Sequence, residues 1–288
     1  MSAAPFAVPV PGGELAGGQW NGDASGMPLV GIHGITSNHV AWSVVADALP
    51  GVRFIAPDLR GRGRSGGLPG PYGLVDHADD VARMLDALGV ERAIVVGHSM
   101  GAFVAVRLAE RHPDRVERLV LIDGGLPVHG DVDLGPARDR LRMTFPSVEE
   151  YLAFWRRHPA LGPWWNDAVE EYARYDLTGT APELRSSVSE EAMAVNAQEL
   201  DGSAGYEEAL AGLTLPIAFV RAPRGLLDAE PLYDPSTVAG WRGRLPWFEA
   251  FEAEDVNHYT ILMTQEGARQ LTPHLPAPPR IGHHPKEN

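Results

Sequence analysis

The sequence contains no cysteine and no long apolar run, and each absence excludes a class of protein. Without cysteine in any of its 288 residues, the chain cannot form disulfides, use a thiol nucleophile or bind a metal through thiolates. No apolar stretch approaches the roughly 20 residues that span a membrane, and the first residues lack the basic and apolar segments of a secretory signal. We therefore expect a cytoplasmic protein without a membrane partner.

Basic residues are also scarce, because 24 Lys and Arg stand against 38 Asp and Glu for a formal net charge of −14. Nucleic acid binding needs basic surfaces, so we expect no nucleic acid partner. The one basic cluster, Arg60 to Arg64, is short and interrupted by glycine. It indicates a structural loop, since no strand–loop–helix phosphate motif surrounds it. We expect a monomer or homodimer that needs no cofactor or metal and whose partner is a small molecule.

Short apolar segments alternate with helical ones along most of the chain, which indicates a mostly parallel sheet covered by helices on both faces. The expected strands are residues 6–10, 14–20, 28–32, 52–57, 92–96, 116–122, 216–220 and 247–251. The expected helices are residues 39–49, 75–88, 99–112 and 260–271, and residues 232–244 are expected to form a helix or an irregular segment. The fold class is therefore α/β with eight strands.

The alternation stops between residues 126 and 212, where we find helical segments and no convincing strand. Expected helices there begin after Ser147, which has the capping-box pattern, and cover residues 163–175 and 182–200. We interpret 126–212 as an inserted helical cap, or lid, on a core formed by residues 1–125 and 213–272. Residues 273–288 are rich in Pro and His and are expected to be a flexible tail.

The most informative motif is Gly97-His98-Ser99-Met100-Gly101, which lies between an apolar strand and a helix without a breaker. A serine on such a sharp turn is held in a strained conformation with its hydroxyl clear of the sheet. The two glycines are expected because a Cβ at either position would collide with the crossing strand and helix. A second G-x-S-x-G copy around Ser65 lies in a loop and precedes no helix. We therefore predict Ser99 as an activated nucleophile.

A serine hydroxyl needs a base within hydrogen-bond reach, and His258 is the best candidate because it lies between the last strand and the last helix. A carboxylate must orient this imidazole. Asp228 is the first choice from the chain order Ser, Asp, His. Asp123, at the end of the strand after the nucleophile helix, is the alternative, with Asp234 and Asp255 behind it.

The negative oxygen of a tetrahedral intermediate needs two aimed donors, usually backbone N–H groups. We expect one from Met100 at the start of the helix, where unpaired amides and the helix dipole both favour negative charge. The other is expected from Ile35, because Gly34 lets the backbone approach closely. His33 is interpreted as a buried structural histidine. His98 is interpreted as a packing residue turned away from Ser99.

Together these residues resemble the α/β-hydrolase superfamily, in its esterase and lipase-like branch with a helical cap. The resemblance extends from Phe6 to Leu271 and rests on His33-Gly34, the stretch from Ala56 to Ser65, the turn at Ser99 and the late His258. It implies that the Ala56–Ser65 stretch shapes a loop. The similar epoxide hydrolases and haloalkane dehalogenases place Asp where this chain has Ser99. One departure is the longer turn from Pro223 to Leu227 before Asp228.

The predicted cap is rich in aromatic residues that could line an apolar pocket over Ser99 or form the core of the cap itself. The pocket candidates are Phe145, Phe154, Trp155, Trp164 and Trp165. The sequence thus predicts a serine hydrolase that acts through an acyl-enzyme on a small ester or related acyl compound with an apolar moiety. Alternatives are C–C bond hydrolysis, lyase or cofactor-free haloperoxidase (perhydrolase) chemistry on the same triad, or a ligand sensor without turnover.

Overall fold

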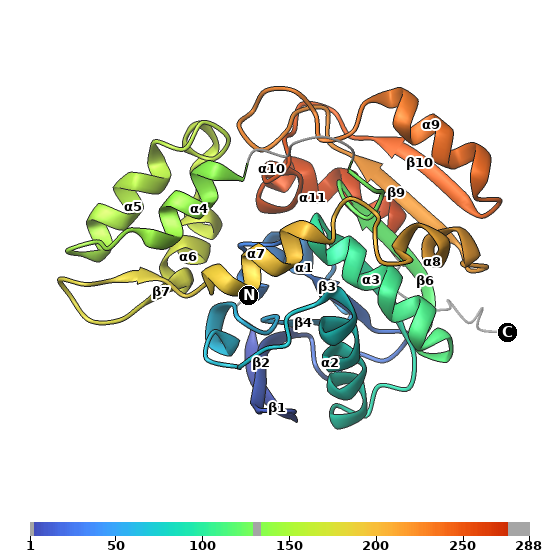
Figure 1. Cartoon of the computed structure of the whole chain (residues 1–288), viewed down its shortest axis with the longest axis horizontal. Coiled ribbons are helices and arrows are strands. Elements are labelled where there is room, and N and C mark those ends of the chain that lie inside the picture. Colours follow the sequence, from blue (N-terminus) through green and yellow to red (C-terminus); the bar gives the residue numbers. More distant parts are fainter. Residues whose placement is uncertain (1–2, 129–133, 276–288) are drawn as a thin grey trace, which may run out of the picture.

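The protein is built around one eight-stranded, mostly parallel sheet, which confirms the predicted fold class (Figure 1). The computed structural model describes residues 3–128 and 134–275. The strand order in space is β1-β2-β4-β3-β5-β6-β9-β10, and only β1 with β2 and β2 with β4 pair antiparallel. The strands are β1 (Ala4–Val10), β2 (Gly13–Trp20), β3 (Leu29–Ile32), β4 (Phe54–Pro57), β5 (Ala93–His98), β6 (Val116–Ile122), β9 (Ile217–Arg221) and β10 (Phe248–Glu252).

Helices cover both faces of the sheet. On one face, α2 (Leu74–Ala87), α3 (Met100–Arg111) and α9 (Pro235–Arg244) share a core cluster. On the other face lie α1 (Ser43–Asp47), α10 (Thr260–Met263) and α11 (Gln265–Leu271). The predicted helix 39–49 begins as a 3-10 turn, His39–Trp42, and the predicted helix 260–271 is divided into α10 and α11.

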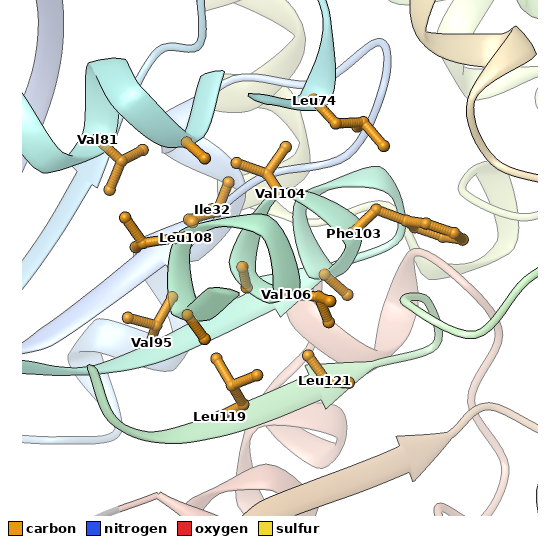
Figure 2. Packing of buried hydrophobic residues seen from close by; sticks show 14 of the residues in the cluster. Ile32, Leu74, Val81, Val95, Phe103, Val104, Val106, Leu108, Leu119 and Leu121 are labelled. Atoms are coloured by element: carbon orange, nitrogen blue, oxygen red, sulfur yellow. The ribbon is translucent and has the colours of Figure 1, made fainter. Parts of the chain in front are cut away.

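Successive residues of the central strands point to opposite faces, so both faces need apolar side chains. In β6, Leu119 and Leu121 face α3, whereas Val120 and Ile122 join the cluster on the other face. Figure 2 shows the α3 side, where Phe103, Val104 and Leu108 pack among residues of the strands and of α2. Because both faces of the central strands are buried, these strands are continuous runs of apolar residues.

Between β6 and β9 the chain forms mainly helices, and α4, α5 and α6 group beside the sheet (Figure 1). The elements are α4 (Gly135–Arg142), α5 (Val148–Arg156), α6 (Asp167–Asp176), α7 (Glu190–Gln198) and α8 (Tyr206–Gly212). Ser147 caps α5 by accepting from the Glu150 amide, as its sequence pattern predicts. Helix α8 packs on α3, where the Phe103 and Tyr206 rings lie 4.9 Å apart. The bounds of the cap, 126–212, stay a prediction.

Two details of this region correct the sequence interpretation. A short antiparallel pair, β7 (Leu177–Thr178) and β8 (Arg185–Ser186), interrupts the helices. The predicted helix 182–200 is correspondingly shorter, since its first residues form β8 and only Glu190–Gln198 are helical. The predicted tail, residues 273–288, begins inside a 3-10 turn, Thr272–His274, and its residues 276–288 lie outside the described part. Within that described part, no helix has the length and hydropathy needed to cross a bilayer.

Candidate active site

Ser99 lies on the sharp turn between β5 and α3 with φ 55° and ψ −126°. A positive φ is strained for a residue with a side chain and persists where the surroundings impose it. Those surroundings require both flanking glycines, as predicted. A Cβ on Gly101 would stand 2.0 Å from the Ile32 carbonyl oxygen, and a Cβ on Gly97 would stand 2.4 Å from Ala102 Cα. The packing of α3 against β3 and β5 therefore fixes the backbone of Ser99.

The end of β6 lies directly against this turn. The Ser99 amide donates to Ile122 O at 3.0 Å, and a Cβ on Gly124 would stand 2.2 Å from Ser99 O. Asp123 lies between Ile122 and Gly124 and has a φ of 43°. It is fully buried, and its Oδ1 accepts from the Ala222 amide at 3.1 Å. Asp123 is thus held on the strand next to that of the predicted nucleophile.

The other oxygen of Asp123 contacts His258, with Oδ2 lying 2.6 Å from Nδ1. Because an ionised carboxylate only accepts, this contact places the imidazole proton on Nδ1 and leaves a lone pair on Nε2. His258 and Ser99 line the same cavity. In the neutral form of the ring, this arrangement therefore places the basic nitrogen on the side away from the carboxylate.

The structure corrects the first choice for the carboxylate that orients His258. Asp228 Oδ1 accepts from Arg224 Nε at 2.8 Å and from Asn257 Nδ2 at 2.9 Å, and its side chain is 31% exposed. Asp228 lies seven residues beyond the end of β9, inside a turn, whereas Asp123 follows β6 immediately. The alternative named from the sequence, Asp123, takes the position beside His258. Asp234 instead caps α9, and Asp255 is an exposed loop acid.

The loop that carries His258 is fixed by its neighbours. Asn257 Oδ1 accepts from the amides of Tyr259 and Thr260, both at 3.0 Å, and its Nδ2 also donates to Ala160 O at 2.9 Å. Asp228 therefore acts on this loop through Asn257. His98 Nε2 donates to the carbonyl oxygen of His258 at 2.7 Å. His98 also lines the cavity, which corrects its interpretation as a packing residue turned away.

The two predicted oxyanion donors, the amides of Ile35 and Met100, border the same cavity. Met100 is the first residue of α3, so its amide has no partner within the helix. Among the described residues, the Ile35 amide has no acceptor either. Gly34 lies close to the nucleophile, because a Cβ there would be 3.2 Å from Ser99 Cβ. Two backbone donors therefore remain available beside Ser99.

His33 fixes the peptide that carries the Ile35 amide. Its Nε2 accepts from the Leu59 amide at 3.0 Å, so the ring proton is on Nδ1, which lies 2.8 Å from Gly34 O. Burial lowers the pKa of His33 to about 4, which keeps the ring neutral. Since Gly34 O and the Ile35 amide belong to one planar peptide, this hydrogen bond orients the donor. The structural role predicted for His33 thus extends to the site.

The basic stretch Arg60–Arg64 supports the same loop from behind. Arg62 is fully buried and donates to Ile35 O at 3.0 Å and to Asn196 Oδ1 at 2.7 Å. Arg60 forms a buried ion pair with Asp80, with 2.8 Å between Nη2 and Oδ2. Ser65 is buried and accepts from the Ala16 amide at 2.9 Å. These contacts agree with the loop role predicted for this stretch and for Ser65.

The cavity over Ser99 has a volume of about 110 Å³ and combines core and cap residues. Of the aromatic candidates, Phe154 and Trp155 line it. The other three do not: Phe145 is buried against Tyr151, Trp165 packs under Arg156, and Trp164 is 38% exposed. The sequence analysis missed most of the lining, which includes Phe103, Val128, Leu134, Arg140, His158, Leu226, Leu232, Tyr259 and Met263. These residues come from separate segments without a common pattern.

Comparison with known proteins agrees with this geometry. The family model described as alpha/beta hydrolase fold matches residues 27–260. The chain is 37% identical to a serine hydrolase-like protein of Danio rerio over 131 residues, which are 44% of this chain and 40% of that protein. It is 39% identical to lipase LipV of Mycobacterium tuberculosis over 99 residues, which are 34% of this chain and 38% of the lipase. The matches thus span about two fifths of these curated relatives.

A solved structure extends the similarity to nearly the whole chain. The crystal structure of E-2-(acetamidomethylene)succinate hydrolase superposes with a TM-score of 0.76 at 25% sequence identity, and the match covers 94% of this chain and 98% of that one. The match therefore covers nearly the whole chain and agrees with a mostly parallel sheet flanked by helices.

Proposed function

Because the chain belongs to the α/β-hydrolase family, we propose that it is a serine hydrolase that cleaves a small ester or related acyl compound through an acyl-enzyme. The observation that carries the proposal is the 2.6 Å contact between Asp123 Oδ2 and His258 Nδ1, on a cavity shared with the strained Ser99. Nucleophile, base and orienting carboxylate are the three parts that acyl transfer by a serine requires.

In the first half of the reaction, Ser99 Oγ attacks the substrate carbonyl carbon while His258 Nε2 takes the hydroxyl proton. Asp123 stabilises the imidazolium that forms. The negative oxygen of the intermediate is held by the amides of Ile35 and Met100. When the intermediate collapses, the bond to the alcohol breaks, and His258 returns the proton to the leaving oxygen.

In the second half, water replaces the alcohol. His258 takes a proton from the water, whose oxygen attacks the carbonyl carbon of the acyl-enzyme. The bond to Ser99 Oγ then breaks, and the proton on His258 returns to this oxygen. The products are one carboxylic acid and one alcohol, and no cofactor is needed. The apolar lining from Phe103, Leu226 and Leu232 favours substrates with an apolar moiety.

The proposal is tested by Ser99→Ala, measured as turnover of p-nitrophenyl butyrate. We expect a loss of at least about 10³-fold in kcat, because the variant retains binding and the oxyanion donors but has no nucleophile. Gly240→Ala is a matched control on α9, where a Cβ would meet nothing within 4 Å. It should leave turnover unchanged. Substantial activity in Ser99→Ala would contradict the assignment.

A fluorophosphonate probe separates the enzyme from a ligand sensor that retains only the pocket. The probe reacts with activated serines, so we expect covalent labelling of the peptide that contains Ser99 and none of the peptide that contains Ser65. Labelling without ester turnover would point to another reaction on the same triad, such as C–C bond hydrolysis or haloperoxidase chemistry. Absence of labelling would favour the sensor.

A further inference from the structure

The wall of the Ser99 cavity carries hydrogen-bond donors and a buried cation but no carboxylate. Of the lining residues in the described part of the chain, none is Asp or Glu, and Arg140 alone bears a permanent charge. This differs from the chain as a whole, whose net charge is −14. Within the described residues, an anionic group in this cavity would therefore meet no acidic side chain of the lining.

Arg140, on α4, is only 3% exposed and has more donors than partners. Its Nη1 donates to Tyr151 Oη at 2.8 Å and to Asp176 Oδ2 at 2.6 Å. Its Nη2 makes one long contact of 3.5 Å with Thr36 O. A guanidinium has five N–H groups, so within the described residues at least two of them have no acceptor. These N–H groups can form charge-assisted hydrogen bonds to a ligand oxygen.

The acid paired with Arg140 is directed away from the cavity. Asp176 does not line the cavity, and its Oδ1 accepts from Ser186 Oγ at 3.0 Å and from Ser187 Oγ at 3.1 Å. Its Oδ2 accepts from Arg140 and from the Tyr151 hydroxyl. Both oxygens of Asp176 are thus saturated inside the cap. Within the described residues, Nε and one N–H of Nη2 are the donors of Arg140 without an acceptor, and Arg140 lines the cavity.

A second donor lies near Arg140 on the same wall. His158 Nδ1 accepts from the Ala160 amide at 3.2 Å, so the ring proton of the neutral form is on Nε2. Burial and, after it, the charge of Arg140 lower the pKa of His158 to about 4. The ring lines the cavity and is 5.5 Å from that of Trp155, over which the Arg140 guanidinium lies at 4.9 Å. At neutral pH this wall therefore presents N–H groups from both residues.

Both donors are close to the reacting groups. Thr36, which Arg140 contacts, directly follows the oxyanion donor Ile35. The His158 ring is 5.5 Å from that of Tyr259, the residue after His258. Ser99, Arg140 and His158 line one cavity of about 110 Å³, so an acyl group bound to Ser99 would share a small space with both donors.

We propose that Arg140, assisted by His158, binds a carboxylate on the acyl part of the substrate, so that the preferred substrates are half-esters of short dicarboxylic acids. This proposal rests on the proposed serine hydrolase function. The Ser99 Oγ–acyl bond forms first, and when the tetrahedral intermediate collapses, the ester C–O bond breaks and the alcohol leaves with the proton from His258. Water then releases the dicarboxylic acid. A charge-assisted, forked contact between guanidinium and carboxylate would hold the substrate throughout.

The experiment compares matched charged and neutral esters by titrating acid release at constant pH. The pairs are monoethyl succinate with ethyl butyrate, monoethyl glutarate with ethyl pentanoate, and monoethyl adipate with ethyl hexanoate. The wild type should show a kcat/KM about 30-fold higher for the half-ester in at least one pair. Arg140→Gln should remove this preference, measured as the ratio of kcat/KM for the half-ester to kcat/KM for its neutral partner.

Two further variants separate ligand binding from a structural role. Arg142→Gln makes the same change on the same helix at an exposed residue paired with Glu190, and it should retain the preference. Arg140→Gln/Asp176→Asn removes both buried charges together, which avoids an unpaired Asp176 if the single variant folds poorly. It should also lose the preference for half-esters and retain turnover of neutral esters.

Three results would overturn the proposal. Equal losses for charged and neutral esters in both Arg140 variants would show that the pair only maintains the cap. Hydrolysis of neutral ethyl esters that depends on Ser99, without preference in any of the three pairs, would exclude the carboxylate site and leave the serine hydrolase function intact. Failure to hydrolyse any ester, with no labelling of Ser99, would contradict the proposed function itself.

Discussion

At the scale of the residue, the site depends on which proton each histidine carries. His258 has Nδ1 against a carboxylate, His33 has Nδ1 toward the Gly34 carbonyl, and His98 donates from Nε2 to the backbone of His258. Burial lowers the pKa of His33 to about 4 and that of His98 well below its usual value. Two neutral histidines therefore orient backbone of the site: His33 orients the peptide of the Ile35 amide, and His98 the carbonyl group of His258.

Replacing Asp123 and Asp228 in turn shows which of these two carboxylates orients His258. Asp123→Asn should lower kcat for p-nitrophenyl butyrate by about 10⁴-fold, because the amide favours the wrong tautomer of His258. Asp228→Asn should lower kcat by less than about tenfold, since Asp228 reaches His258 only through Asn257. A larger loss from Asp228→Asn would return the catalytic role to the residue first chosen from the sequence.

At the scale of the element, the sequence was sufficient for the strands and helices of the core but not for the carboxylate or the cap. The succession of strands and helices along the chain follows from the alternation of apolar and helical segments. The turn at Ser99 follows from the two flanking glycines, where a Cβ would collide with neighbouring backbone. Asp123 and Asp228 both follow strands before His258, so chain order could not separate them. The β7–β8 pair was missed because strands of two residues leave no periodicity to detect.

The steric argument for the turn at Ser99 predicts the outcome of two Gly→Ala changes within helices. Gly101→Ala places a Cβ 2.0 Å from the Ile32 carbonyl, which is rigid backbone, and should cost at least about 3 kcal/mol of unfolding free energy. Gly240→Ala on α9 meets nothing within 4 Å and should stabilise the protein by about 0.5–1 kcal/mol.

Urea denaturation followed by circular dichroism measures both changes. The argument for a tightly crossed strand and helix would be wrong if Gly101→Ala matched the wild type, or if both variants were destabilised equally.

At the scale of the whole molecule, buried neutral histidines make the free energy of unfolding depend on pH. Burial is the main cause of the low pKa of His33, His77 and His98, and each of these rings is fully enclosed. In the unfolded chain each would titrate near pH 6.5. Below that pH the unfolded state binds more protons than the folded state. Stability must therefore fall as the pH decreases from about 6.5 toward the pKa of the folded state.

Thermal melts between pH 7.5 and 5.5 test this linkage. His33, whose pKa is about 4, contributes a loss of about 1.4 kcal/mol over this interval, and the lowered pKa values of His77 and His98 act in the same direction. The Tm of the wild type should therefore fall by several degrees. His77 Nε2 lies 3.1 Å from Asn196 Oδ1. The variant His77→Gln retains a donor for this oxygen, but its side chain does not titrate. The Tm of the variant should fall less than that of the wild type between pH 7.5 and 5.5. An identical fall in Tm would contradict the assignment of His77 as a neutral buried group.

The most direct test of the central claim is to trap the acyl-enzyme. After rapid mixing with p-nitrophenyl butyrate and acid quench, mass spectrometry of the intact protein should show the added mass of one butyryl group. Digestion should place this group on the peptide that contains Ser99, and Asp123→Asn should slow its formation. Turnover of the ester without any adduct, or an adduct on another residue, would contradict the assignment of Ser99 as the nucleophile.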